Sequence, residues 1–206
     1  MEDVRELKAL QLDALREVAN IGAGHAATAL SQMTQRKIMI AVPEVNVRPL
    51  QEVTEFVGAP DEVIAAVLMH MMGDLTGRTL VIFPEESART LCDILLRRPA
   101  GTTRQFGEME QSGLKEAGNI LSSAYLNALS DFMGMMLVPS VPSLVVDLSA
   151  AVITTTYLNF GHDRDFVFCV ETSFRVEGTA ELLRGHFLLL PDMPSLRAIF
   201  DAIRLP

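Results

Sequence analysis

Two Glu–Asn pairs recur along the chain at the same spacing, and they are the residues best suited to chemistry. Asn20 follows Glu17 by three residues, and Asn119 follows Glu116 by three residues. A carboxamide has no useful pKa near neutral pH, but it can hold a water molecule in position, as positioning residues do in phosphoryl transfer. A carboxylate can orient a cationic partner group through a charge-assisted hydrogen bond. Such a site suits a substrate that brings its own metal ion and an already reactive bond, such as an acyl phosphate on another protein.

The two pairs belong to an internal repeat with an offset of 99 residues. Seven of the twenty positions in 12–31 are identical to their counterparts in 111–130, and the register continues without a gap to Pro43 and Pro142. We therefore predict a single domain over residues 1–206. It contains repeat 1 at about 7–98 and repeat 2 at about 108–206.

Each pair lies on the polar side of a predicted amphipathic helix, at about 7–34 and about 108–133. At about 100° per residue, Glu17 and Asn20 fall within about 40° of Asp13, and Ser112 shares an edge with Glu116 and Asn119. The opposite sides are apolar or small, which predicts burial. The residues predicted to be buried are Leu12, Leu15, Val18, Ala19, Gly22, Ala26, Ala29, Leu30 and Met33 in the first helix, and Leu114, Ala117, Gly118, Leu121, Tyr125, Ala128, Leu129 and Phe132 in the second.

Packing therefore explains the repeated Leu and Ala positions but not the repeated Glu and Asn. One interpretation is a solvated helix face that has not diverged since duplication, because Glu is common on helices. Asn is harder to explain in this way, since it is a mediocre helix former and has no evident capping role inside the apolar pattern. The alternative is a functional site on each helix.

The remaining elements predict an α+β fold. Strands are predicted at 37–42, 63–71 and 78–83 in the first repeat, and at 135–138, 151–159, 166–176 and 182–190 in the second, with shorter helices at 85–97 and 193–203. We predict an internally duplicated, pseudo-two-fold domain. Its antiparallel-rich β-sheet is flanked by the two long amphipathic helices and the two shorter ones.

Composition excludes several classes of function. The net charge of −9 and the lack of Trp argue against binding of nucleic acid or of an anionic membrane. The N-terminus has no apolar signal region and the most apolar stretch is too short to cross a bilayer, so we expect a cytoplasmic protein without membrane insertion. Cys92 and Cys169 are expected to be buried, reduced thiols.

Two motif-like patterns are set aside. The four histidines are scattered and have no metal-ligand spacing, so no metal or cofactor site is expected in this chain. The stretch from Gly22 to Ala27 matches G-x-G-x-x-A, but it lies inside a helix rather than between a strand and a helix. We expect its small residues to let the helix sit close to the sheet.

The residues around both pairs resemble the CheC family of chemotaxis phosphatases, within the CheC/CheX/FliY group. The family pattern is Asp or Ser, three residues, Glu, two residues, Asn, twenty-two residues, Pro. The chain contains this pattern twice, and the resemblance extends over nearly the whole sequence. The two copies are Asp13, Glu17, Asn20 and Pro43, and Ser112, Glu116, Asn119 and Pro142.

This resemblance implies hydrolysis of the aspartyl phosphate of the response regulator CheY. Asn20 and Asn119 would each orient the attacking water, and Glu17 and Glu116 would each pair with a regulator lysine. Mg²⁺ would be supplied by the regulator. Asp13, Ser112, Pro43 and Pro142 would have supporting roles.

An alternative from another class remains open. The chain could be a non-catalytic adaptor that binds a response regulator or the deamidase CheD, which family members often bind. An Asn retained at both sites favours catalysis, because a pure scaffold has no need of it.

Overall fold

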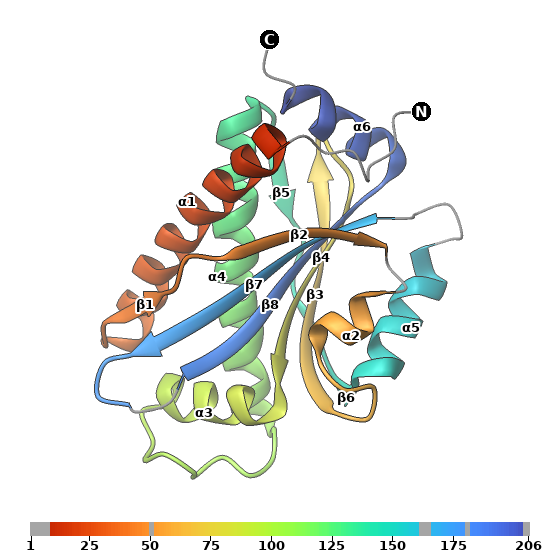
Figure 1. The fold of residues 1–206 in the computed structure, drawn as a ribbon. Helices are drawn as coiled ribbons and strands as arrows, with labels where there is room; N and C mark the ends of the chain where they lie inside the picture. Colours follow the sequence, from red (N-terminus) through yellow and green to blue (C-terminus); the bar gives the residue numbers. More distant parts are fainter. Residues whose placement is uncertain (1–8, 50–51, 161–165, 180–181, 204–206) are drawn as a thin grey trace.

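The computed structural model describes residues 9–49, 52–160, 166–179 and 182–203. Its two halves contain the same elements in the same order (Figure 1). The first half contains α1 (Ala9–Thr34), β1 (Ile38–Ile40), β2 (Glu44–Pro49), α2 (Val53–Val57), β3 (Val63–Gly73), β4 (Gly77–Pro84) and α3 (Glu85–Leu95). The second half contains α4 (Glu108–Met133), β5 (Leu137–Pro139), β6 (Ser143–Leu148), α5 (Ser149–Phe160), β7 (Phe166–Val176), β8 (Leu182–Pro191) and α6 (Met193–Ala202).

The strands of the described residues form one sheet in the order β1-β7-β8-β4-β3-β5, with β2 beside β7 and β6 beside β3. The pairs between these strands are antiparallel, as predicted. The outer strands are exchanged between the halves: β1 and β2 pair with β7 of the second half, and β5 and β6 pair with β3 of the first. The sheet therefore has a two-fold symmetric topology, centred on the pairing of β4 with β8.

Helices cover both faces of the sheet, but unequally. The larger core lies between the sheet and the helices α1, α3, α4 and α6. These helices contribute to the core residues such as Leu30, Leu91, Leu121 and Ile199. The smaller core lies on the other face, beneath α2 and α5 (Figure 1). The sequence predicted the four helices of the larger layer but neither helix of the smaller one.

The prediction of a strand at 151–159 is wrong, because this segment forms most of helix α5. Its run of Val, Ile and Thr favours a strand locally, because β-branched side chains lose rotamer freedom in helices. In the structure, Val152, Ile153 and Thr156 are buried at helical spacing. Val152 and Ile153 pack in the same core as Val53 and Val57 of α2, so tertiary burial overrides the local preference.

The long helices α1 and α4 run antiparallel to one another against the sheet (Figure 1). A Cβ atom added at Gly22 would lie 2.7 Å from Cδ1 of Tyr125, and one added at Gly118 would lie 2.6 Å from Cβ of Val67 in β3. Glycine at 118 thus lets α4 approach the sheet, whereas Gly22 lets α1 approach α4. The prediction that the small residues at 22–27 serve the sheet contact is therefore wrong for Gly22, which serves the contact between the two helices.

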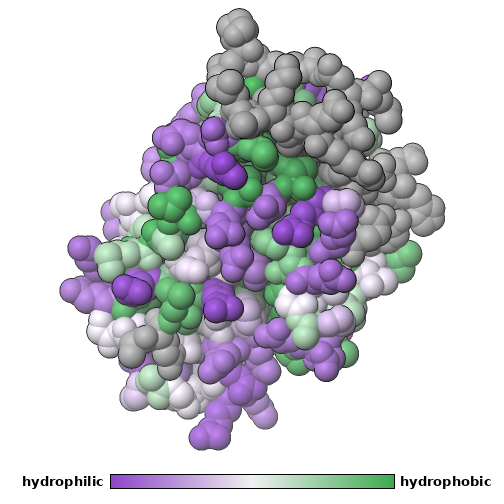
Figure 2. Space-filling view, viewed as in Figure 1, coloured by the Kyte–Doolittle hydropathy of each residue, from purple (hydrophilic) through white to green (hydrophobic). Residues whose placement is uncertain are grey.

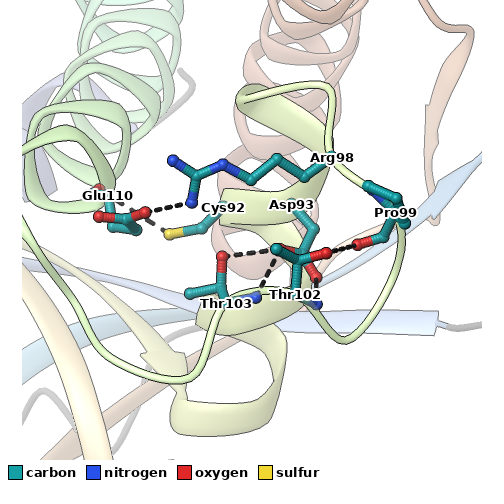
Figure 3. A network of polar contacts seen from close by, with 7 residues as sticks. All are labelled: Cys92, Asp93, Arg98, Pro99, Thr102, Thr103 and Glu110. Carbon is teal, nitrogen blue, oxygen red and sulfur yellow. Dashed lines mark hydrogen bonds and ion pairs between the residues drawn. The ribbon is translucent and has the colours of Figure 1, made fainter.

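The linker between the halves is held by buried charges (Figure 3). Asp93 is 2% exposed and accepts hydrogen bonds from the backbone N–H groups of Thr102 and Thr103 and from the Thr103 hydroxyl. Arg98 forms an ion pair with Glu110 in the first turn of α4. The hydrogen bonds within Glu110 and from Arg98 lower the pKa of Glu110. These contacts fix the chain at the point where the second repeat begins.

Candidate functional site

The four predicted catalytic residues lie on the outward surfaces of α1 and α4. Glu17, Asn20 and Glu116 are exposed, and Asn119 is half-buried. Across the described residues, no hydrogen bond or ion pair engages any of these four side chains. Residues three apart on a helix have Cβ atoms about 5–6 Å apart, so each Glu and its Asn project side by side. Each pair therefore presents a free carboxylate and a free carboxamide to an approaching molecule.

The opposite surfaces of the two helices are packed as the sequence predicted. Leu15, Val18 and Ala19 of α1 and Leu114 and Ala117 of α4 are all buried. Phe132 was predicted to be buried but is 41% exposed, and Leu12, Ala29 and Met33 are only half-buried. The packing fixes the rotation of each helix, and this rotation directs the Glu–Asn pairs to solvent.

The two pairs are separated from one another. Taking the Gly22–Tyr125 contact as the crossing point of the antiparallel helices, Asn20 and Asn119 are about 12 Å apart along the helix axes at 1.5 Å per residue. Asn20 lies about 160° around its helix from Gly22, and Asn119 about 120° from Tyr125. Both therefore point away from the other helix, which gives two separate sites on opposite flanks of the helix pair.

The two prolines of the pattern end equivalent bulges in the outer strands. Residues 41–43 and 140–142 each place three residues opposite two on the neighbouring strand, β7 or β3. An extra residue of this kind defines a β-bulge and bends the strand. Pro43 and Pro142 each stand directly before the next strand segment, where the lack of an N–H group fits the break in the ladder.

The twenty-two residues between Asn and Pro follow from the geometry of the helix and the returning strand. From Asn20, the helix descends about 21 Å to its end at Thr34, and the strand then rises about 17 Å from Ile38 to Pro43. Two contacts support this path. The backbone N–H of Ile38 donates to Ser31 Oγ at 2.9 Å, and Val45 lines a small apolar cavity together with Leu15 and Val18. The bulge consequently lies beside the helical turn that carries the Asn.

The flanking residues differ between the two copies. Both residues are exposed. Asp13 forms an ion pair with Arg16, with Oδ1 and Nη1 2.9 Å apart, whereas its counterpart Ser112 carries no charge. An exposed pair of this kind contributes little to stability. The first site therefore carries an ion pair at its edge where the second has a hydroxyl group.

Two further residues beside the sites were not identified from the sequence. Val42 and Val141 directly precede the prolines and are 80% and 87% exposed. The Val-Pro dipeptide recurs at the same offset of 99 residues as the Glu–Asn pairs, and this recurrence could have revealed both valines.

The two cysteines are unsuited to nucleophilic catalysis. Burial raises the pKa values of the Cys92 and Cys169 thiols to about 12, and both cysteines are buried and free, as predicted. Across the described residues, no three His, Cys, Asp or Glu side chains gather so as to hold a metal ion. No helix of the described part of the chain combines the length and apolar character needed to span a bilayer.

Comparison with solved structures defines the class of fold. FliY of Thermotoga maritima superposes with a TM-score of 0.76 and 19% identity over 96% of this chain and 98% of that chain. A chain of the CheX–CheY–BeF3–Mg²⁺ complex of Borrelia burgdorferi superposes with a TM-score of 0.50 and 13% identity over 82% of this chain and 95% of that chain. The protein thus has the fold shared by FliY and by a component of the CheX complex.

Sequence comparison then identifies the family. The model of the CheC-like family matches residues 10–47 and 109–146, so each match covers one complete copy of the pattern from Asp or Ser to Pro. The CheY-P phosphatase CheC of Bacillus subtilis is 36% identical over 199 residues, which are 96% of this chain and 95% of that protein. The chain belongs to the CheC-like family.

Proposed function

We propose that this chain is a protein phosphatase that hydrolyses the aspartyl phosphate of phosphorylated CheY, a chemotaxis response regulator. One observation carries the proposal: both repeats hold a Glu and an Asn at i, i+3 on the solvent side of a helix whose other side is packed. These polar groups have no partner within the described structure, so they are available to a substrate protein. The similarity to a CheY-P phosphatase over nearly the whole chain supports the same substrate.

In the proposed reaction, Asn20 or Asn119 enters the active-site pocket of the regulator. Its carboxamide accepts a hydrogen bond from a water molecule and holds the water in line with the phosphorus atom. The water oxygen bonds to phosphorus as the bond to the aspartyl oxygen breaks, which releases inorganic phosphate and restores the carboxylate of the regulator. The phosphatase forms no covalent intermediate, since a carboxamide cannot act as the nucleophile.

Glu17 and Glu116 are assigned a role in orientation. Each carboxylate pairs with a lysine of the regulator and so fixes the direction in which the neighbouring Asn points. Mg²⁺ bound by the regulator neutralises charge on the phosphoryl oxygens. The CheX–CheY–BeF3–Mg²⁺ complex, one chain of which has a similar fold, supports this assignment because it contains both CheY and that ion. Asp13 and Ser112 lie at the edges of the sites, and Pro43 and Pro142 shape the neighbouring bulges.

The proposal is tested with the single variants Asn20→Ala and Asn119→Ala and with the double variant. Loss of label from radiolabelled phospho-CheY is measured in the presence of Mg²⁺. Each single variant is expected to retain the activity of its intact site. The double variant should lose about 10²-fold or more, as expected when the attacking water is no longer positioned. Ala is a better helix former than Asn, so both helices should stay folded.

A matched control is available on α4. Asn127 is exposed on the same helix but belongs to neither pair, so Asn127→Ala should leave turnover unchanged. Unchanged turnover in a folded Asn20→Ala, Asn119→Ala variant would show that the carboxamides are not catalytic. Binding of phospho-CheY by the wild-type chain without any loss of label would favour the adaptor function instead.

A further inference from the structure

The two valines in the bulges are more exposed than any other large hydrophobic residue of the described chain. Val42 is 80% exposed and Val141 is 87% exposed, whereas the next values are 63%. Single exposed hydrophobic residues are normal on protein surfaces and need no explanation. Here, however, both copies of the repeat present the same residue at the same position, next to the same Asn-bearing helical turn.

The backbone holds each valine outside the sheet in a fixed conformation. The preceding residues anchor the bulges, because the N–H of Ala41 donates to the carbonyl of Ser173 at 2.9 Å and that of Ser140 to the carbonyl of His70 at 2.8 Å. The following proline confines each valine to extended backbone angles, and the β-branched side chain has restricted rotamers. Little conformational entropy would therefore be lost if a partner covered these side chains.

The chemistry of the sites creates a need for such contacts. Exposed Glu and Asn side chains orient a partner and add specificity, but their net contribution to affinity is small in water. Affinity comes mainly from apolar side chains buried at the centre of an interface. Hydrophobic side chains are scattered among hydrophilic ones over much of the face seen in Figure 2. The apolar side chains that accompany the Asn residues are the valines of the bulges and the residues that directly follow each Asn, Ile21, which is 43% exposed, and Ile120, which is half-buried.

We propose that Val42 and Val141 are docking residues that pack against the apolar rim of the regulator's active-site pocket when the neighbouring Asn enters it. This inference rests on the proposed phosphatase function and adds a specificity-determining residue to each site. Val42 serves the site of Asn20, and Val141 serves the site of Asn119. The valines position the substrate protein and do not touch the phosphoryl group, so they act on KM rather than on kcat.

The test replaces each valine by threonine in a chain that retains one site. Threonine keeps the β-branch, and with it the backbone preference before proline, but replaces a methyl group by a hydroxyl. Val42→Thr is made in the Asn119→Ala chain and Val141→Thr in the Asn20→Ala chain. KM for phospho-CheY is expected to rise roughly fivefold, the effect of losing the burial of about one methyl group, with kcat within about twofold. Val42→Ile should keep KM at or below its original value.

Val145→Thr is the matched control. Val145 is 41% exposed on β6 and pairs with Ala66, which belongs to the smaller core. Its side chain therefore lies on the face of the sheet that points away from α1 and α4. It should leave KM unchanged in both single-site chains, and thermal unfolding followed by circular dichroism should show every variant folded. If Val42→Thr and Val141→Thr give the same KM as Val145→Thr, the docking role is wrong. If the Asn20→Ala, Asn119→Ala chain is as active as the wild type, the proposed function itself fails, so the two failures are distinguishable.

Discussion

Two glycines on helix α1 lie two residues apart, and the structure predicts different effects on stability when each is replaced by alanine. At Gly22, an added Cβ would lie 2.7 Å from Cδ1 and 3.0 Å from Cα of Tyr125. At Gly24, no atom lies within 4 Å of an added Cβ. Gly24→Ala should therefore stabilise the protein and Gly22→Ala should destabilise it relative to Gly24→Ala.

The difference between the two variants isolates the cost of overpacking. Each replacement gains about 1 kcal/mol of helix propensity, so this contribution cancels when the variants are compared. Tyr125 cannot retreat easily, because its hydroxyl shares a 2.9 Å hydrogen bond with Thr172 and its ring stacks on Phe187 with centroids 4.7 Å apart. Overpacking of a fixed neighbour costs about 1–3 kcal/mol, and the two variants should differ in free energy of unfolding by this amount.

Urea unfolding measured by far-ultraviolet circular dichroism is the suitable assay, because the chain has no Trp and two Tyr residues. The slopes of the transitions should agree between variants, so that the midpoints report stability alone. Equal midpoints for Gly22→Ala and Gly24→Ala would refute the close approach of α1 to Tyr125. The separation and opposite orientation deduced for the two sites would then also lose their basis.

Three further predictions concern the fold. Asp93→Ala should lower the free energy of unfolding by about 3–5 kcal/mol, because it leaves the buried donors around Asp93 without an acceptor, whereas the exposed Asp131→Ala should change it by less than about 0.5 kcal/mol; urea titration measures both. Chains of residues 1–98 or 108–206 alone should show no cooperative thermal unfolding, because each lacks the strand on which its outer strands pair; a cooperative transition in either would contradict the role of strand exchange. Burial lowers the pKa of His186 to about 4, so between pH 6.5 and 4 this side chain gains its proton only in the unfolded chain. Through this group the free energy of unfolding should fall by about 2 kcal/mol from pH 7 to 5, and an unchanged pH slope in His186→Phe would contradict this.

The sequence was sufficient for the elements that carry the sites. The apolar periodicity of α1 and α4 extends over seven turns in each helix, and a stripe of that length fixes both the element and its rotation. The solvent exposure of Glu17, Asn20 and Glu116 follows from that rotation alone. The assignment of catalytic roles to these residues stays a prediction, since exposure is necessary for the proposed chemistry but does not demonstrate it.

Other features could not be predicted, because they depend on contacts distant in sequence. Helix α5 has the composition of a strand and becomes helical where its apolar side packs against α2 and the sheet. The partner of Gly22 is on another helix, 103 positions further along the chain at Tyr125, and no local pattern identifies it. Strand exchange is equally hidden, because the sequence pattern of β1 and β2 is the same whether they pair within their own half or with β7.

Strand exchange gives a structural reason for the presence of two candidate sites in one chain. The unit that forms the first site consists of α1, the bulge at Pro43 and strand β2, and β2 pairs only with β7 of the second half within the described sheet. The unit around Asn119 depends in the same way on β3 of the first half. The rotation of each helix about its axis therefore depends on strands of the other repeat. We therefore expect a chain that loses one Asn to fold, and a chain that loses either half of the sheet to lose both candidate sites. The smallest structure that supports one Glu–Asn helix in this way already contains the scaffold of both.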